Sequence, residues 1–164
     1  MKRTGKVAAV VAIAMAMVLL GGCGLIAQKA VQSATGVKVD QSGGKTTVTG
    51  PNGQSATVSS DSGKVPDGLP DTVPVYSGKI TGSAAVTTPQ GNSYQFVVTT
   101  SDSISTVIDW YKTQLAAKGW TIDATVMTGE QGLVSGKNGT SQIAVTAGTD
   151  NGSTDVHTIV TVKQ

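Results

Sequence analysis

One amphipathic segment, set among short alternating ones, most constrains the fold of this chain. In SDSISTVIDWYKTQLAAKGW, residues 101–120, apolar side chains recur at the spacing of one helix face: Ile104, Val107, Ile108, Tyr111 and Leu115. Asp102 is the predicted N-cap. Gly119 stands where a left-handed residue ends a helix, and Trp120 follows it, placed to pack back on Leu115. A helix with one apolar stripe needs a second layer to cover it.

The segments on both sides of this helix alternate apolar and polar residues, as strands do. Before it, residues 80–87 and 93–100 flank a turn at 89–92 and predict a hairpin. After it, strands are expected near 120–126, 133–136, 143–147 and 156–162, with turns at Asn138-Gly139 and Asn151-Gly152. In the first of these strands, the buried face is expected to consist of Trp120, Ile122, Ala124 and Val126.

This order, β-β-α-β-β-β-β, predicts an α+β fold over residues 77–164, with one helix packed on one face of an antiparallel sheet. The opposite face is expected to be rich in threonine and hydrated. With only 4% aromatic residues, the core must consist mainly of aliphatic side chains.

The N-terminus has the organisation of an export signal over residues 1–22. Three cationic residues precede an apolar stretch, Val7–Leu20, which has the length of a signal-peptide core and is short for a membrane span. The next residues, Leu20-Gly21-Gly22-Cys23, resemble the lipobox of bacterial lipoproteins, with an aliphatic residue, two small ones and a cysteine. The resemblance implies cleavage after Gly22 and a diacylglyceryl group on Cys23. The alternatives are an uncleaved membrane helix over Val7–Ala27 and a buried, inert cysteine.

Lipidation would place the chain on a bacterial cell membrane or envelope, with its domain outside the cytoplasm. Each buried methylene of an acyl chain such as palmitate contributes about 0.8 kcal/mol to membrane binding. Cys23 is the only cysteine, so the folded part is expected to lack a disulfide. Without the three basic residues that precede Cys23, 9 basic and 10 acidic residues remain, for a net charge of −1. No basic patch for nucleic acid is left.

Three segments join the anchor to the domain. Residues 23–36 read as the lipidated cysteine and a short helix or spacer, and residues 37–63 as a meander of β-hairpins with Gly-Gly and Asn-Gly turns. The meander is either an edge extension of the main sheet or a stalk. Residues 64–76 form a connector with a proline at every fourth position, which predicts a stiff brace or a ligand for a proline-recognising groove.

The stretches LPDTVPVYSG and TTSDSISTVIDWYKTQLAAKGWTI are similar to a group of uncharacterised bacterial lipoproteins. These share a proline-rich entry, a helix containing WY and a GW exit before a β-meander. The resemblance spans roughly residues 25–164. It implies an envelope location and a small α+β domain, and it brings no activity or catalytic residue with it.

Few residues are candidates for chemistry. His157, the only histidine, falls on the polar face of its strand, where a solvated side chain is expected in preference to a metal ligand with Asp155. The segment 148–155, GTDNGSTD, loosely resembles a calcium loop, but its Asn-Gly favours a hairpin turn. Trp110 lies off the centre of the apolar stripe, so it either caps the edge of the core or is exposed as a contact for a partner.

These observations predict a membrane-anchored lipoprotein with a non-enzymatic binding or scaffolding domain and an envelope protein or polymer as partner. No cofactor or metal is expected beyond the lipid on Cys23. One alternative is an inhibitor or protective protein that acts on an envelope hydrolase through a hairpin such as 149–155. The other is a hydrolase, which would need a concave site with converging polar groups.

Overall fold

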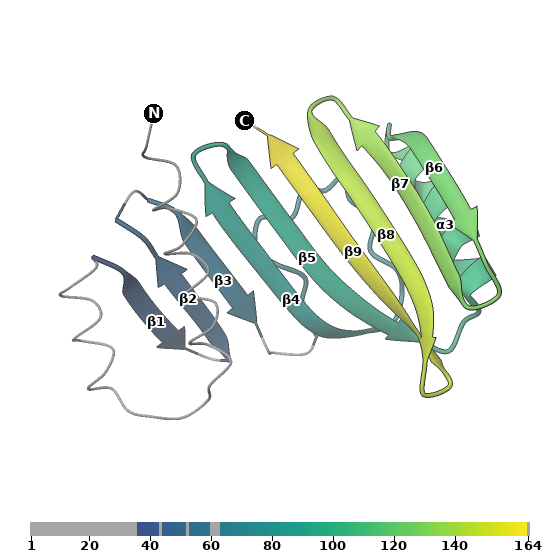
Figure 1. The fold of residues 1–164 in the computed structure, drawn as a ribbon, viewed down its shortest axis with the longest axis horizontal. Coiled ribbons are helices and arrows are strands. Elements are labelled where there is room, and N and C mark those ends of the chain that lie inside the picture. The colour runs from purple at the N-terminus through teal and green to yellow at the C-terminus, as the bar shows by residue number, and fades with distance from the viewer. Residues whose placement is uncertain (1–35, 43, 52, 60–62, 164) are drawn as a thin grey trace.

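A computed structural model describes residues 36–42, 44–51, 53–59 and 63–163 (Figure 1). The predicted signal peptide and the lipidation motif lie outside the described residues, as does most of the predicted spacer.

The described residues form one antiparallel sheet and one helix, α3 (Ile104–Ala117), which confirms the α+β class. The order of the strands across the sheet is β1-β2-β3-β4-β5-β9-β8-β7-β6. Their bounds are β1 Lys38–Ser42, β2 Lys45–Thr49, β3 Ser55–Ser59, β4 Lys79–Thr88, β5 Gly91–Thr100, β6 Thr121–Met127, β7 Gln131–Asn138, β8 Ser141–Asp150 and β9 Ser153–Lys163.

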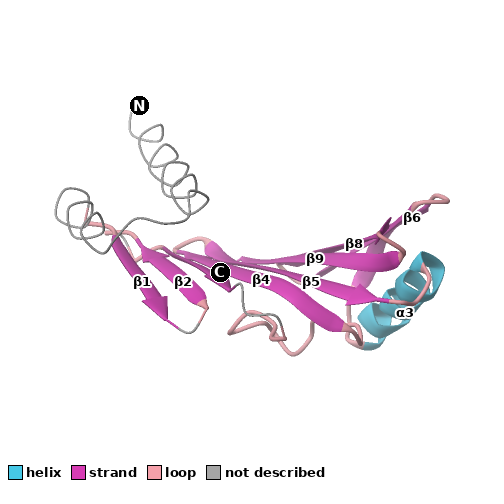
Figure 2. Cartoon of the chain, turned by 90° about the horizontal axis from the view of Figure 1, so that it is seen from below, coloured by secondary structure: helices cyan, strands magenta, loops and turns pink. Residues whose placement is uncertain are grey.

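Helix α3 carries the chain from the middle of the sheet to its far edge. After β5 the chain runs through α3 to the edge strand β6, and β7, β8 and β9 then return by hairpins until β9 pairs with β5. Figure 2 shows α3 and the loop between β3 and β4 on the same side of the sheet. The fold therefore has one covered face and one face that no other described element covers.

The N-terminal meander extends the main sheet. Strand β3 pairs antiparallel with β4, from Ser55 opposite Thr87 to Ser59 opposite Ser83. Strands β2 and β1 then follow outward as consecutive hairpins.

The two ends of α3 are fixed by different local interactions. Asp102 as the N-cap was a wrong prediction: Ser103 is the N-cap, and its Oγ accepts a hydrogen bond from the Thr106 N–H (3.2 Å). The Asp102 carboxylate instead accepts a hydrogen bond from the Tyr76 hydroxyl (2.7 Å). Because it is engaged with Tyr76, it does not cap the N-terminus of α3. At the C-terminus Gly119 has φ +81°, as predicted, and the N–H of Trp120 donates to the carbonyl of Leu115 (2.9 Å). This is the Schellman arrangement.

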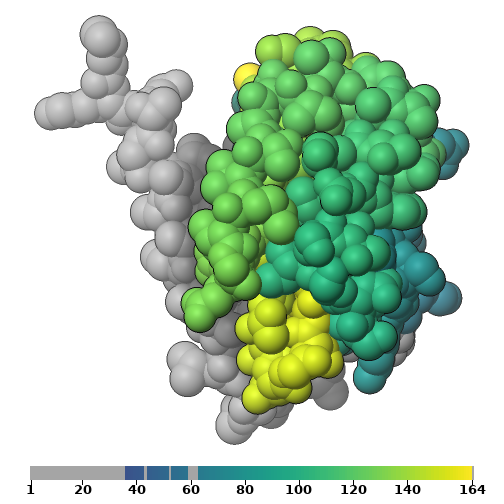
Figure 3. All heavy atoms as spheres, turned by 90° about the vertical axis from the view of Figure 1, so that its right-hand side faces the viewer, coloured from purple at the N-terminus to yellow at the C-terminus, as the bar shows by residue number. Residues whose placement is uncertain are grey.

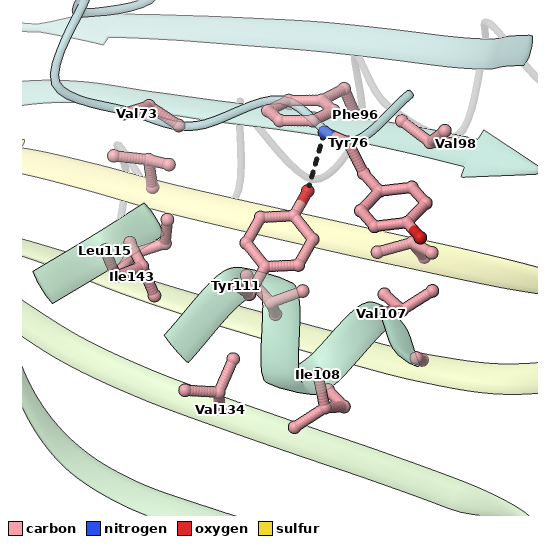
Figure 4. Close-up of a cluster of buried hydrophobic side chains, with 14 of the residues drawn as sticks. Val73, Tyr76, Phe96, Val98, Val107, Ile108, Tyr111, Leu115, Val134 and Ile143 are labelled. Atoms are coloured by element: carbon pink, nitrogen blue, oxygen red, sulfur yellow. Dashed lines mark hydrogen bonds between the residues drawn. The ribbon is translucent and has the colours of Figure 1, made fainter. Parts of the chain in front are cut away.

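The proline-rich segment 64–76 is packed into the core. Val73 and Tyr76 are buried in the same cluster as Phe96, Tyr111 and Leu115 (Figure 4). The helix side supplies polar contacts to this segment, since the Tyr76 N–H donates to the Tyr111 hydroxyl (3.4 Å) and Trp120 Nε1 donates to the carbonyl of Thr72 (2.7 Å). Burial of these side chains makes the segment a cover for the sheet beside α3.

Strand β6 differs from its predicted pattern. The register shifts between Ile122 and Ala124, so that Ile122 pairs with Gly136 while Ala124 pairs with Ser135. A bulge of one residue moves the following side chains to the other face. Ala124 and Val126 are therefore exposed, and their predicted burial was wrong.

Candidate binding face

The side of the sheet away from α3 is named the open face. Directly opposed residues on neighbouring antiparallel strands point to the same side, so its residues follow from the register. Its middle row crosses the sheet from β2 to β6 as Thr46, Val58, Ala84, Gln95, Ile159, Ala144, Ser135 and Ala124. The residues that alternate with this row, such as Phe96, Thr158 and Val160, are buried under the helix and the connector.

Two further rows flank the middle one. On one side they are Gly82, Val97, His157, Thr146, Leu133 and Val126. On the other they are Val39, Val48, Ala56, Val86, Ser93, Thr161, Gln142 and, on β7, Lys137. The three rows contain one charged residue, Lys137, at the β7 end of the last row.

The open face is more aliphatic than the sequence pattern predicts. Its three rows hold three threonines against eight valine, leucine and isoleucine residues, so the prediction of a threonine-rich face was wrong. The reason lies in β2 and β3, where Thr47 and Thr57 point to the covered side and hydrogen-bond each other (3.0 Å). Val58, Val126 and Ile159 are 44, 53 and 45% exposed, which leaves apolar area in contact with water.

A shallow hollow of about 280 Å³ lies within this face, where β3, β4, β5 and β9 run side by side. It is bordered by Val58, Gly82, Ala84, Gln95, Val97, His157 and Ile159. A Cβ built on Gly82 would meet no atom within 4 Å, so the absent side chain at Gly82 leaves room there. Gly82 follows a register shift in β4 that turns it toward the open face, opposite Val97.

His157 is exposed on the open face, as its position in the strand predicts. Its direct neighbours across the strands are Val97 and Thr146, and Asp155 lies two residues along the same side. The Asp155 carboxylate accepts a hydrogen bond from Thr99 Oγ1 (2.6 Å). Within residues 36–163, as far as they are described, no three His, Cys, Asp or Glu side chains are grouped closely enough to hold a metal ion.

Trp110 lies on the covered side, away from the open face. It is partly buried against the core, and its ring meets those of Tyr76 and Tyr111 edge to face, each with centroids 4.9 Å apart. It therefore caps the edge of the helix–sheet interface. A contact with a partner through its remaining exposed edge stays a prediction.

A second hollow, of about 130 Å³, lies on the covered side between the connector and β2 to β4. The Lys45 ammonium and the Asp67 carboxylate meet there at 2.7 Å. The hydrogen bond from Lys45, together with its charge, lowers the pKa of Asp67. The Lys45–Asp67 pair thus already engages two of the charged groups at this hollow, which is also smaller than the hollow on the open face.

The segment 148–155 is a hairpin end, as predicted. Asn151 (φ +47°) and Gly152 (φ +81°) form the turn between β8 and β9, and Asn151 Nδ2 donates to the Asp150 carboxylate (3.1 Å). The hairpin extends past the neighbouring strands at one end of the sheet (Figure 1). Figure 3 shows the molecule from the β6 edge of the sheet, where α3 and β6 lie side by side.

Sequence reasoning found His157 but missed the aliphatic character of the face around it. The sequence does contain a sign of this aliphatic face: several apolar residues alternate with the core positions, such as Val58, Val86 and Val97. The lipidation residues Leu20, Gly21, Gly22 and Cys23 lie outside the described residues. In the described part of the chain, no helix combines the length and apolar character needed to cross a membrane.

Comparison with known proteins finds one family model that matches part of the chain. Residues 80–154, from β4 through α3 to the start of β9, match a family described as START domain-like. No curated protein and no solved structure matches the chain. The domain that carries most of the open face is thus similar to the START domain-like family.

Proposed function

We propose that this chain is a lipid-anchored, extracytoplasmic protein whose domain binds a partner through the open face and catalyses no reaction. The observation that carries the proposal is the asymmetry of the sheet. One face is covered by α3 and the connector, and the other presents rows whose middle is uncharged, with half-exposed Val58, Val126 and Ile159.

The covered side is already filled by the chain's own side chains. Val98, Val107, Tyr111 and Leu115 have no exposed area, and Phe96 has 1%. A ligand could enter between α3 and the sheet only by displacing this close-packed core. Binding to the open face instead removes water from apolar surface, which contributes about 25 cal/mol for each Å² buried.

The similarity to the START domain-like family over residues 80–154 favours a ligand-binding domain over a catalytic one. The anchor is inferred from Leu20-Gly21-Gly22-Cys23 alone. An anchor at this position would hold the domain at the outer side of a membrane, within reach of an envelope protein or polymer.

The anchor is tested by comparing the wild-type chain with Cys23→Ser. The wild type is expected to take up labelled palmitate and to have a mature mass that starts at residue 23, whereas Cys23→Ser takes up none. A wild-type chain that keeps residues 1–22 and takes up no palmitate would contradict the anchor.

The binding face is tested by capture of partners from solubilised membranes with Ile159→Lys and Thr113→Lys. Both positions are exposed, but only Ile159 lies on the open face, since Thr113 lies on the outer side of α3. Capture is expected to be lost with Ile159→Lys and kept with Thr113→Lys, while both variants unfold at wild-type denaturant concentrations. Loss of the cellular phenotype with His157→Ala while capture is kept would favour an enzyme, and loss of the phenotype with changes at Asn151 alone would favour an inhibitory hairpin.

A further inference from the structure

We infer that the molecule bound by the open face is a second copy of this chain, packed face to face. The inference rests on the proposed function only in taking the open face as the binding face. Four features of that face lead to a second copy.

The first feature is the distribution of charge. The middle of the face is neutral, and charges stand at its margins: Lys137 and Asp123 pair at 2.9 Å near the β6 edge, Lys79 and Asp155 lie at one end, and Lys163 lies at the other. A charged side chain buried without a partner is costly. The neutral middle of the face can pack against its own copy without that cost, because it contains no charge to bury.

The second feature is area. Six strands, β3, β4, β5, β9, β8 and β7, are adjacent in that order. With strands about 4.8 Å apart that rise about 3.3 Å per residue, they present roughly 850 Å² on one side. A stable interface needs about 800 Å² from each partner. The face therefore matches, in size, one half of a two-sheet sandwich with sheets about 10 Å apart.

The third feature is shape. The hollow beside Gly82 and the half-exposed side chains of Val58 and Ile159 occur on the same face, so one face carries both a recess and the aliphatic groups to fill it. A two-fold axis brings such elements together twice, because each contact made by one copy is repeated by the other.

The fourth feature is the protection of the sheet edges. Lys38 and Asp40 are exposed on the edge strand β1, and the other edge strand, β6, contains a bulge and the charged Asp123. Charges and bulges on edge strands prevent strand-to-strand addition. Pairing through faces then gives a closed dimer and does not continue into a fibre.

Cysteine cross-linking of the full-length chain in its own membrane tests this inference. Cys23 is the only cysteine and carries lipid in the proposed form, so an introduced cysteine is the only free thiol. Gln95→Cys and Ile159→Cys place it on the open face, and Thr113→Cys places it on the outer side of α3 as a matched control. A bismaleimide that spans about 10 Å matches the distance between packed sheets.

The open-face variants are expected to give a covalent dimer at least about tenfold faster than Thr113→Cys, where tenfold corresponds to about 1.4 kcal/mol. When copies with two different tags are expressed together, the product should contain both tags. Cross-linking of Gln95→Cys and Ile159→Cys that is no faster than that of Thr113→Cys would overturn the inference.

The outcomes separate this inference from the proposed function. If Ile159→Lys abolishes partner capture and the open-face cysteines form no dimer, the face binds a different molecule, so the inference is overturned and the binding function stands. If the open-face cysteines form dimers at least about tenfold faster than Thr113→Cys in a chain that takes up no palmitate, the anchor is contradicted and the inference stands.

Discussion

Replacing Gly132 with alanine tests how closely α3 approaches the sheet. Gly132 lies on β7 beneath the helix, and a Cβ there would meet Ile108 Cγ1 at 2.6 Å, Ile104 Cγ2 at 2.8 Å and Met127 Sδ at 3.0 Å. Forcing an extra methyl group into a packed core costs about 1–3 kcal/mol. Loss of glycine's freedom in the unfolded chain offsets about 0.4–1 kcal/mol of that cost. We expect a net loss of about 1–2 kcal/mol in the free energy of unfolding.

The assay is urea unfolding followed by tryptophan fluorescence, because Trp120 is buried in the core. With a slope of about 1.5 kcal/mol/M, the midpoint should fall by about 1 M. Gly148→Ala is the matched control on β8, since a Cβ there meets only the Glu130 carbonyl, at 3.9 Å, and it should leave the midpoint nearly unchanged. The cost of Gly132→Ala should also shrink in an Ile108→Ala background, where the nearest clashing atom is gone. Equal midpoints for Gly132→Ala and wild type, or equal losses for both glycine variants, would refute the close approach.

Three further predictions concern the connector and the helix. Ser103→Ala should lower the free energy of unfolding by about 1 kcal/mol, because the N-cap of α3 is lost, and urea unfolding measures this. Trp120→Phe should cost about 0.5–1.5 kcal/mol in the same measurement, because the hydrogen bond from Trp120 Nε1 to the Thr72 carbonyl is lost. Burial, followed by the hydrogen bond to Asp102, raises the pKa of Tyr76 to about 12. The unfolded chain then loses this proton first, so stability should fall as the pH rises from about 10 toward 12, as measured by unfolding at several pH values. Tyr76→Phe should lose less stability than wild type over that pH range, and an equal loss would rule out Tyr76 as a source.

Local patterns were sufficient for the parts of the fold that local interactions determine. The helix stripe from Ile104 to Leu115, the Gly119 terminus and the Asn151-Gly152 turn all follow from short-range spacing and from residues that adopt positive φ, and the structure confirms them. The α+β class follows from the same periodicities.

Long-range packing decided the features that the sequence did not reveal. A bulge at residue 123 reverses the faces of Ala124 and Val126, and no residue type in TIDATVM signals it. Tyr76 binds Asp102 from the connector, which leaves Ser103 to cap the helix. Both outcomes depend on contacts between segments far apart in the chain.

The candidate site was the hardest feature to predict, because it belongs to a surface made by many strands. Val58, Gln95 and Ile159 come from three separate segments, and only the strand order and register place them in one row. Each strand alone shows one or two out-of-phase aliphatic residues, which are common on protein surfaces.

The most direct test of the central claim, that the open face is occupied by a partner, is the rate at which a small maleimide modifies Ile159→Cys. We predict that the thiol reacts about tenfold or more slowly in the intact cell envelope than in dilute, purified protein, a protection of about 1.4 kcal/mol or more. Thr113→Cys, on the outer side of α3, should react at the same rate in both settings. Equal rates for Ile159→Cys in the envelope and in dilute solution would contradict the claim.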